Sequence, residues 1–120
     1  MRIAVAALAS LALAGAAIAI PAWAHHGWES YDASKQQKVT GKITELKWEQ
    51  PHAVLWLDVN GKKTEVWLSP LQRMVDRGLS KEALGAGKTV TVEAQPSTKA
   101  GGEWKALAIN VDGKDFNLMR

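Results

Sequence analysis

The sequence predicts a mainly β fold, a small five-stranded barrel, and three features of the 120-residue chain indicate it. First, several segments after residue 37 alternate apolar with polar side chains, which is the two-residue period of a half-buried strand. Second, Asn60-Gly61 separates two such segments, and this pair is the strongest short signal for a hairpin. Third, a single α-helical pattern follows the third of these segments and precedes the fourth.

The first 24 residues have the layout of a secretory signal peptide. A positive start at Met1-Arg2 precedes an apolar run over 3–20, and Pro21 leads into an Ala-Trp-Ala cleavage site. An uncleaved membrane anchor is the alternative, because the apolar run is near the lower length limit for a spanning helix. Since the small-residue site directly follows a helix-breaking proline, we expect cleavage after Ala24. This predicts a periplasmic location and no stable membrane anchor after cleavage.

The rest of the chain is expected to form one small domain. Residues 25–37 are polar, show no clear period and are predicted to form an N-terminal arm ahead of a barrel domain over 38–118. The absence of cysteine excludes disulfides, thiolate zinc sites, iron–sulfur clusters and cysteine nucleophiles. The formal charge of +3 is spread along the chain without a dense basic run, which argues against a nucleic-acid partner.

The first strand, over 38–48, changes phase midway. Val39 and Ile43 share one parity, whereas Leu46 takes the other. Such a change predicts a β-bulge near Thr44-Glu45, the usual device that curls a strand around a barrel.

Segments 52–59 and 62–69 form the predicted hairpin, and its two-residue turn fixes their register. The expected core-face pairs are Leu57/Thr64, Leu55/Val66 and Ala53/Leu68. The expected outward pairs are Asp58/Lys63, Trp56/Glu65, Val54/Trp67 and His52/Ser69. Opposite charges and aromatic–aliphatic neighbours across the strands support this register.

A helix is predicted after the third strand, with Ser69 as its cap, Pro70 in its first turn and Gly78 at its end. Its apolar stripe is expected to plug the barrel end and comprises Leu71, Met74, Val75 and Leu79. A second short turn follows at 80–84. The later elements are a strand over 88–95 with Val90, Val92 and Ala94 inward, a flexible loop over 96–102, and a strand over 103–112 with Leu107, Ile109 and Val111 inward. This β-β-β-α-β-β order with a bulged first strand fits a small OB-like barrel, with an open β-roll as the alternative.

Several short motifs occur in a fixed order along the mature chain. They are His25-His26-Gly27-Trp28, Thr40-Gly41-Lys42-Ile43, Trp48-Glu49-Gln50-Pro51-His52, Ser69-Pro70 with Arg77-Gly78-Leu79, and Gly87-Lys88-Thr89-Val90-Thr91-Val92. From His25 to about Val111 the chain thereby resembles a family of small exported bacterial proteins, the domain of unknown function 6152. Gln50 departs from the asparagine expected before the Pro-His pair. The resemblance implies a barrel fold and an exported location, and it brings no established activity.

The three histidines, His25, His26 and His52, are candidate metal ligands. Cleavage after Ala24 would give His25 a free α-amine, and an imidazole with an amine nitrogen suits Cu(II). A third nitrogen from His26 or His52 would complete a copper site. The alternative is structural: the tandem histidines form a polar chain start, and His52 caps its strand and bonds Ser69.

The outward face of the hairpin is the second candidate site. Its candidate ligand-binding residues are Trp56, Trp67, Trp48 and His52. On an OB-like barrel such a face can stack bases or sugars. The alternative is that the arm covers this face through Trp28 and Tyr31, since an uncovered tryptophan patch would invite aggregation.

These observations predict a non-catalytic periplasmic binding or accessory domain, whose partner is a periplasmic protein or a small ligand. No serine lies in a nucleophile-elbow context, and the sequence contains no paired strand carboxylates and no phosphate-binding glycine loop. The alternative is a periplasmic copper-binding protein that uses His25 with His26 or His52. A copper-dependent redox enzyme would need the same ligands and an open coordination position.

Overall fold

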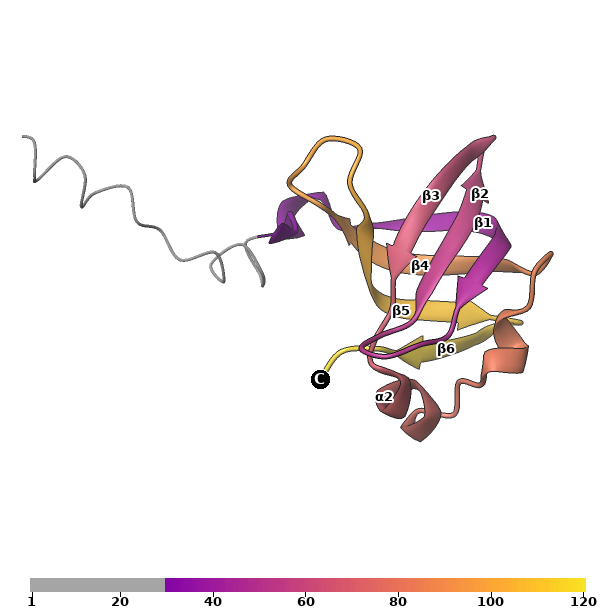
Figure 1. Ribbon diagram of the computed structural model, residues 1–120. Helices are drawn as coiled ribbons and strands as arrows, with labels where there is room; N and C mark the ends of the chain where they lie inside the picture. Colours follow the sequence, from indigo (N-terminus) through magenta and orange to yellow (C-terminus); the bar gives the residue numbers. More distant parts are fainter. Residues whose placement is uncertain (1–29) are drawn as a thin grey trace, which may run out of the picture.

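The computed structural model describes residues 30–120, which form a β-barrel with one short α-helix (Figure 1). The strands are β1 (Gln37–Lys47), β2 (Val54–Val59), β3 (Lys62–Trp67), β4 (Thr89–Pro96), β5 (Trp104–Val111) and β6 (Lys114–Asn117). The helix α2 (Leu71–Asp76) and the 3₁₀ turn η4 (Lys81–Leu84) lie between β3 and β4, and the 3₁₀ turn η3 (Ala33–Lys35) precedes β1.

The first five strands close into the barrel. Antiparallel pairing joins β1 to β2 and β4, β2 to β3, and β4 to β5. The closing pair is parallel and short, because β3 meets β5 only at Val66–Trp104 and Trp67–Lys105. This order confirms the OB-like barrel and excludes the open β-roll, which would leave β3 and β5 as unpaired edges.

The predicted hairpin and bulge are both confirmed. Every expected pair from Val54/Trp67 to Val59/Lys62 is present in the β2–β3 register. The turn residues Asn60 and Gly61 have φ angles of 53° and 84°, as a type I′ turn requires. The β1–β2 register shifts between Ile43 and Glu45, at the predicted bulge. Two positions expected to face outward are wrong, since Val54 is only 8 % exposed and Ser69 is also buried.

The helix is anchored differently from the prediction. Pro70 is the N-cap residue of α2, and the Ser69 hydroxyl is buried and donates instead to the Leu118 carbonyl oxygen. The end of α2 has a Schellman pattern, in which Leu79 N–H donates to the Met74 carbonyl and Gly78 N–H to that of Val75.

The apolar stripe of the helix lies only partly in the core. Met74 and Leu79 are fully buried and plug the barrel end, and Leu71 packs against the core. Val75 is 56 % exposed, so its assignment to the core is wrong. The reason is that α2 has only six residues and presents one side to the barrel.

The last part of the domain holds one confirmed strand, one correction and one strand that was not predicted. Val90, Val92 and Ala94 of β4 are buried, as expected. In β5, Ala106 is buried and Leu107 is half-buried, so the inward assignment of Leu107 is wrong. A register shift after Glu93 makes two β5 residues face one position of β4, which turns Leu107 off the inward face. The strand β6 was missed, although Asp112-Gly113 turns the chain with φ angles of 54° and 83°.

The domain has a single core that fills the barrel and continues under α2 and η4. Its largest fully buried side chains are Ile43, Leu55, Leu57, Met74, Leu79, Leu84, Ile109, Val66, Val90 and Val92. None of the helices between residues 30 and 120 has the length and apolar character that crossing a membrane requires.

Candidate functional site

The outer face of β2 and β3 carries most of the residues that the sequence analysis selected. His52, Trp56 and Trp67 are all half-buried there. The His52 ring lies against the Trp67 ring, with 4.6 Å between centroids and 35° between planes. The indole Nε1–H of Trp67 donates to Glu65 Oε2 at 2.6 Å. His52 therefore packs on Trp67 and does not bond Ser69, whose hydroxyl is taken by Leu118.

Trp56 lies in the middle of this face, between two carboxylates. In the register it is opposite Glu45 of β1 and Glu65 of β3. The Lys63 ammonium lies 5.8 Å from the Trp56 ring centroid, within the range of a cation–π interaction, and 3.4 Å from Glu45 Oε2. Glu45 is thus paired with Lys63, whereas Glu65 keeps its negative charge and accepts a hydrogen bond from the Trp67 indole.

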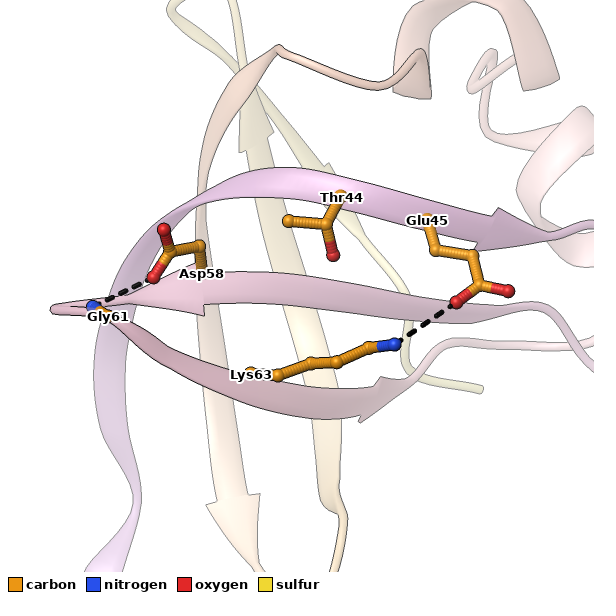
Figure 2. A pocket seen from close by; sticks show the side chains of 5 residues that line it. All are labelled: Thr44, Glu45, Asp58, Gly61 and Lys63. Atoms are coloured by element: carbon orange, nitrogen blue, oxygen red, sulfur yellow. Dashed lines mark hydrogen bonds and ion pairs between the residues drawn. The ribbon is translucent and has the colours of Figure 1, made fainter.

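A shallow depression of about 290 Å³ lies on the same side of the barrel, and Figure 2 shows its lining from β1, β2 and the hairpin. The Asp58 carboxylate accepts a hydrogen bond from Gly61 N–H at 2.8 Å, which stabilises the turn. The Lys63–Glu45 ion pair spans its other side, as the dashed line in Figure 2 marks. Because Lys63 and Glu45 pair with each other and Asp58 stabilises the turn, the depression has a structural explanation.

Of the other selected residues, only Trp48 lies in the described part of the chain. Trp48 follows the end of β1 and is half-buried against the hydrophobic core. His25 and His26 lie outside the described residues. Within residues 30–120 no three His, Asp or Glu side chains gather to hold a metal ion. Copper binding through His25 therefore stays a prediction.

A larger groove, of about 830 Å³, lies where β3 diverges from β5. Its volume is within the range of roughly 300–1,000 Å³ that ligand sites usually have. One wall is formed by Trp56 and by residues 62–65 of β3. The other wall is the β4–β5 loop, residues 97–103, with the adjoining ends Pro96 and Trp104.

The β4–β5 loop is held in place by the segment before β1. Thr98 N–H donates to the Ser30 carbonyl at 2.9 Å, and Asp32 N–H donates to that of Pro96 at 2.9 Å. Figure 1 shows the loop and η3 side by side at this end of the barrel. Within the loop, Ser97 N–H donates to the Glu103 carbonyl at 2.9 Å. The second wall of the groove is therefore a built element tied by backbone hydrogen bonds.

Tyr31 adds a side-chain link at the same place. Its hydroxyl donates to Glu103 Oε1 at 3.4 Å. Burial, the charge of Glu103 with this hydrogen bond, and the charge of Glu65 raise the pKa of Tyr31 to about 12. Tyr31 lies at the β4–β5 loop, so the described part of the arm supports the groove wall, and Trp56 and Trp67 stay partly exposed.

The charges of the groove are unevenly matched. Asp32 accepts hydrogen bonds from Ser34, which lower the pKa of its carboxyl, and it lies 4.0 Å from the Lys35 ammonium. In the part of the chain that the structure describes, Lys62 and Lys99 form no ion pair. Each wall of the groove thus presents one lysine without an ion pair among the described residues, and each wall also carries one carboxylate, Glu65 on β3 and Glu103 on the loop.

Sequence reasoning found Trp56 and missed the rest of the groove. The loop was expected to be flexible, because Gly101-Gly102 and the small polar residues around it are typical of a mobile turn. Two signals for the groove were present, one on each wall: Trp104 directly after this loop, and the Lys62-Lys63 pair directly after the hairpin turn. Neither could show that they face each other, because that depends on the parallel β3–β5 closure.

The strand order defines a small OB-like barrel, and the groove between β3 and the β4–β5 loop is its candidate ligand site. The model of the family described as "Family of unknown function (DUF6152)" matches residues 12–105, and the chain belongs to this family. This match confirms the family that the sequence motifs indicated. A comparison with curated proteins finds none that matches.

Proposed function

We propose that the protein is an exported, non-catalytic binding domain of the periplasm, whose ligand occupies the groove between β3 and the β4–β5 loop. The observation that carries the proposal is the construction of the groove. It has a hydrogen-bonded wall, a half-buried tryptophan and an unpaired cation on each side. A preformed concave site with aromatic lining and a few polar groups is the usual form of a ligand site.

The export part of the proposal rests on the signal-peptide layout of residues 1–24. Mass spectrometry of the protein from a periplasmic fraction tests it, and the expected chain begins at His25. A chain that keeps residues 1–24 or stays in the cytoplasm would contradict it. The same measurement decides whether copper binding through the His25 amine is open to the protein, because only a chain that begins at His25 has an amine and an imidazole on one residue.

The binding part is tested with the periplasmic protein and four probes: tetragalacturonate, chitotetraose, a glutamate-rich hexapeptide and inorganic phosphate. Amide spectra recorded during each titration show which residues respond. We expect at least one probe to saturate the protein and to shift the amides of the β4–β5 loop and of β3. If no probe shifts these amides at millimolar concentration, the groove is not a ligand site for these classes.

Two tryptophan variants provide a matched comparison. Trp56→Ala removes an aromatic side chain that lines the groove, and we expect it to weaken binding at least fivefold, since stacking on one aromatic ring contributes about 1–3 kcal/mol. Trp48→Ala removes a half-buried tryptophan that packs against the core and does not line the groove. We expect its Kd to stay within about twofold, with folding of both variants verified from their amide spectra.

A further inference from the structure

We propose that the ligand is an acidic peptide segment in extended conformation, which adds to the free edge of β3 as a further strand. This inference rests on the proposed function, because it names the occupant of the same groove. It follows from where the groove lies on β3, from the backbone groups that β3 presents there, and from the unpaired cations.

The groove runs along the edge of β3. Residues 62, 63, 64 and 65 all line it, although successive side chains of a strand point to opposite faces of the sheet. A site on one face would contact every second residue only. Four consecutive lining residues therefore place the groove beside the strand, where a neighbouring strand would lie, over a length of about 13 Å at 3.3 Å per residue.

The backbone of β3 is available at this edge. In a hairpin with a two-residue turn, Val59 and Lys62 exchange both hydrogen bonds, and bonding then alternates along the strands. Lys63 and Glu65 consequently direct their backbone N–H groups away from β2. The strand β5 pairs with β3 only from Val66 onward, so among the described strands none pairs with Lys63 on this side. An added strand satisfies these groups in the way that β-augmentation does.

The groove carries charges of both signs, and two of its lysines favour carboxylates at the positions of the added strand that lie opposite them. Lys63 is paired with Glu45, whereas Glu65 keeps its negative charge while it accepts the hydrogen bond of Trp67, and Glu103 on the loop carries a second negative charge. Lys62 on β3 and Lys99 on the loop form no ion pair within residues 30–120. They flank the vacant strand position from its two sides. Carboxylates on an extended segment complement both cations.

The experiment titrates the periplasmic protein with a capped hexapeptide of alternating Glu and Thr or Val residues. Binding is followed by amide spectra and by hydrogen exchange of the Lys63 and Glu65 amides. We expect both amides to shift and to exchange at least tenfold more slowly when the peptide is bound. Two N-methylated versions, blocked at odd or at even residues, give the decisive comparison. Only one edge of the peptide can pair with β3, so one version should bind and the other should fail.

Charge variants test the role of the lysines. Lys62→Gln with Lys99→Gln is expected to weaken the Kd about fivefold, as loss of two exposed ion pairs predicts. Lys42→Gln with Lys81→Gln removes the same charge at two exposed positions outside the groove and should leave the Kd unchanged within twofold.

Three results would overturn the inference and leave the proposed function intact. Tetragalacturonate could saturate the groove while the hexapeptide does not, which assigns the site to an acidic saccharide. Both N-methylated peptides could bind equally, which excludes strand addition. The Lys63 amide could become protected with rising protein concentration and no peptide, which assigns the edge to a second copy. Failure of every probe to perturb the groove contradicts the proposed function as well.

Discussion

The two halves of β3 have opposite environments. Its C-terminal half pairs with β5 at Val66 and Trp67, and the chain then enters the buried positions Leu68 and Ser69. Its N-terminal half, Lys62 to Glu65, lines the groove and pairs only with β2. We call the part where β3 pairs with β5 the sealed end of the barrel, and the part where Lys62 to Glu65 do not pair with β5 the open seam.

The sealed end is saturated with contacts from the C-terminal tail. The Ser69 hydroxyl and Arg73 Nη1 both donate to the Leu118 carbonyl oxygen. Arg77 donates to the carbonyls of Asn117 and Met119 at 2.7 and 3.0 Å. These bonds fasten the segment after β3 to the end of β6 and to the tail that follows it, so the polar groups of this segment stabilise the fold.

The difference between these two regions separates structural from functional residues in this domain. At the sealed end, apolar side chains are buried and cationic side chains bond to carbonyl oxygens of the same chain. At the open seam, a strand edge and two lysines lack such partners among the described residues. Substitutions at the sealed end should therefore change stability, and those in the groove should change binding.

The largest expected effect is at the barrel plug. Met74→Ala removes a fully buried side chain and should lower the free energy of unfolding by about 2–5 kcal/mol. Val75→Ala, one residue further along α2, changes a side chain that is 56 % exposed and should alter it by less than about 0.5 kcal/mol. Urea denaturation followed by tryptophan fluorescence measures both. Equal losses would show that α2 does not plug the barrel as described.

A smaller effect is expected where β1 crosses β2. A Cβ at Gly41 would lie 2.7 Å from the Asp58 carbonyl oxygen, a backbone atom that cannot turn aside. Gly41→Ala should therefore cost about 1–3 kcal/mol through a forced backbone shift.

Gly85→Ala is the matched control for this substitution. Gly85 has a φ of −65°, and its nearest neighbour to a Cβ would be 3.8 Å away, so this variant should be as stable as the parent or slightly more stable. Unfolding midpoints in urea compare the two variants. A Gly41→Ala protein as stable as Gly85→Ala would mean that the strands do not approach so closely.

The fold was largely predictable, because local signals and burial agreed along most strands. The Asn60-Gly61 turn and the phase change before Leu46 each fixed a register without help from distant residues. The strand β6 was missed although Asp112-Gly113 is the same kind of turn signal, because the four residues after it are too short and polar to show a period. Leu107 was misplaced because its bulge has no local signature.

The candidate site was predictable only in part, since a register orients side chains but does not bring distant loops together. It put Trp56 and Trp67 on one outward face, and both are half-buried there. The environment of Trp48 was not predictable from the register, because Trp48 follows the end of β1 and packs against the hydrophobic core. The groove needs the β4–β5 loop opposite β3, which follows from a parallel pairing between strands that are far apart in sequence.

The smallest expected effect concerns the groove wall formed by the β4–β5 loop, and it is measured as the pKa of Tyr31. Burial and the neighbouring Glu103 carboxylate favour its neutral form, which raises its pKa from 10.0 to about 12. The neutral side chain therefore supports the folded state fully below pH 10. As the pH rises from 10 through 12, the unfolded chain releases this proton first, and that support is lost.

Tyr31 is the single tyrosine of the sequence, so the tyrosinate absorbance near 295 nm reports this side chain alone. We expect a midpoint near 12 for the folded protein and near 10 in urea. Glu103→Gln should lower the folded midpoint, which should still stay above 10 because burial is the largest cause of the shift. A folded midpoint at 10 would mean that Tyr31 is not held against the β4–β5 loop. The groove would then have only one fixed wall, and the contrast between the two halves of β3 would lose its functional meaning.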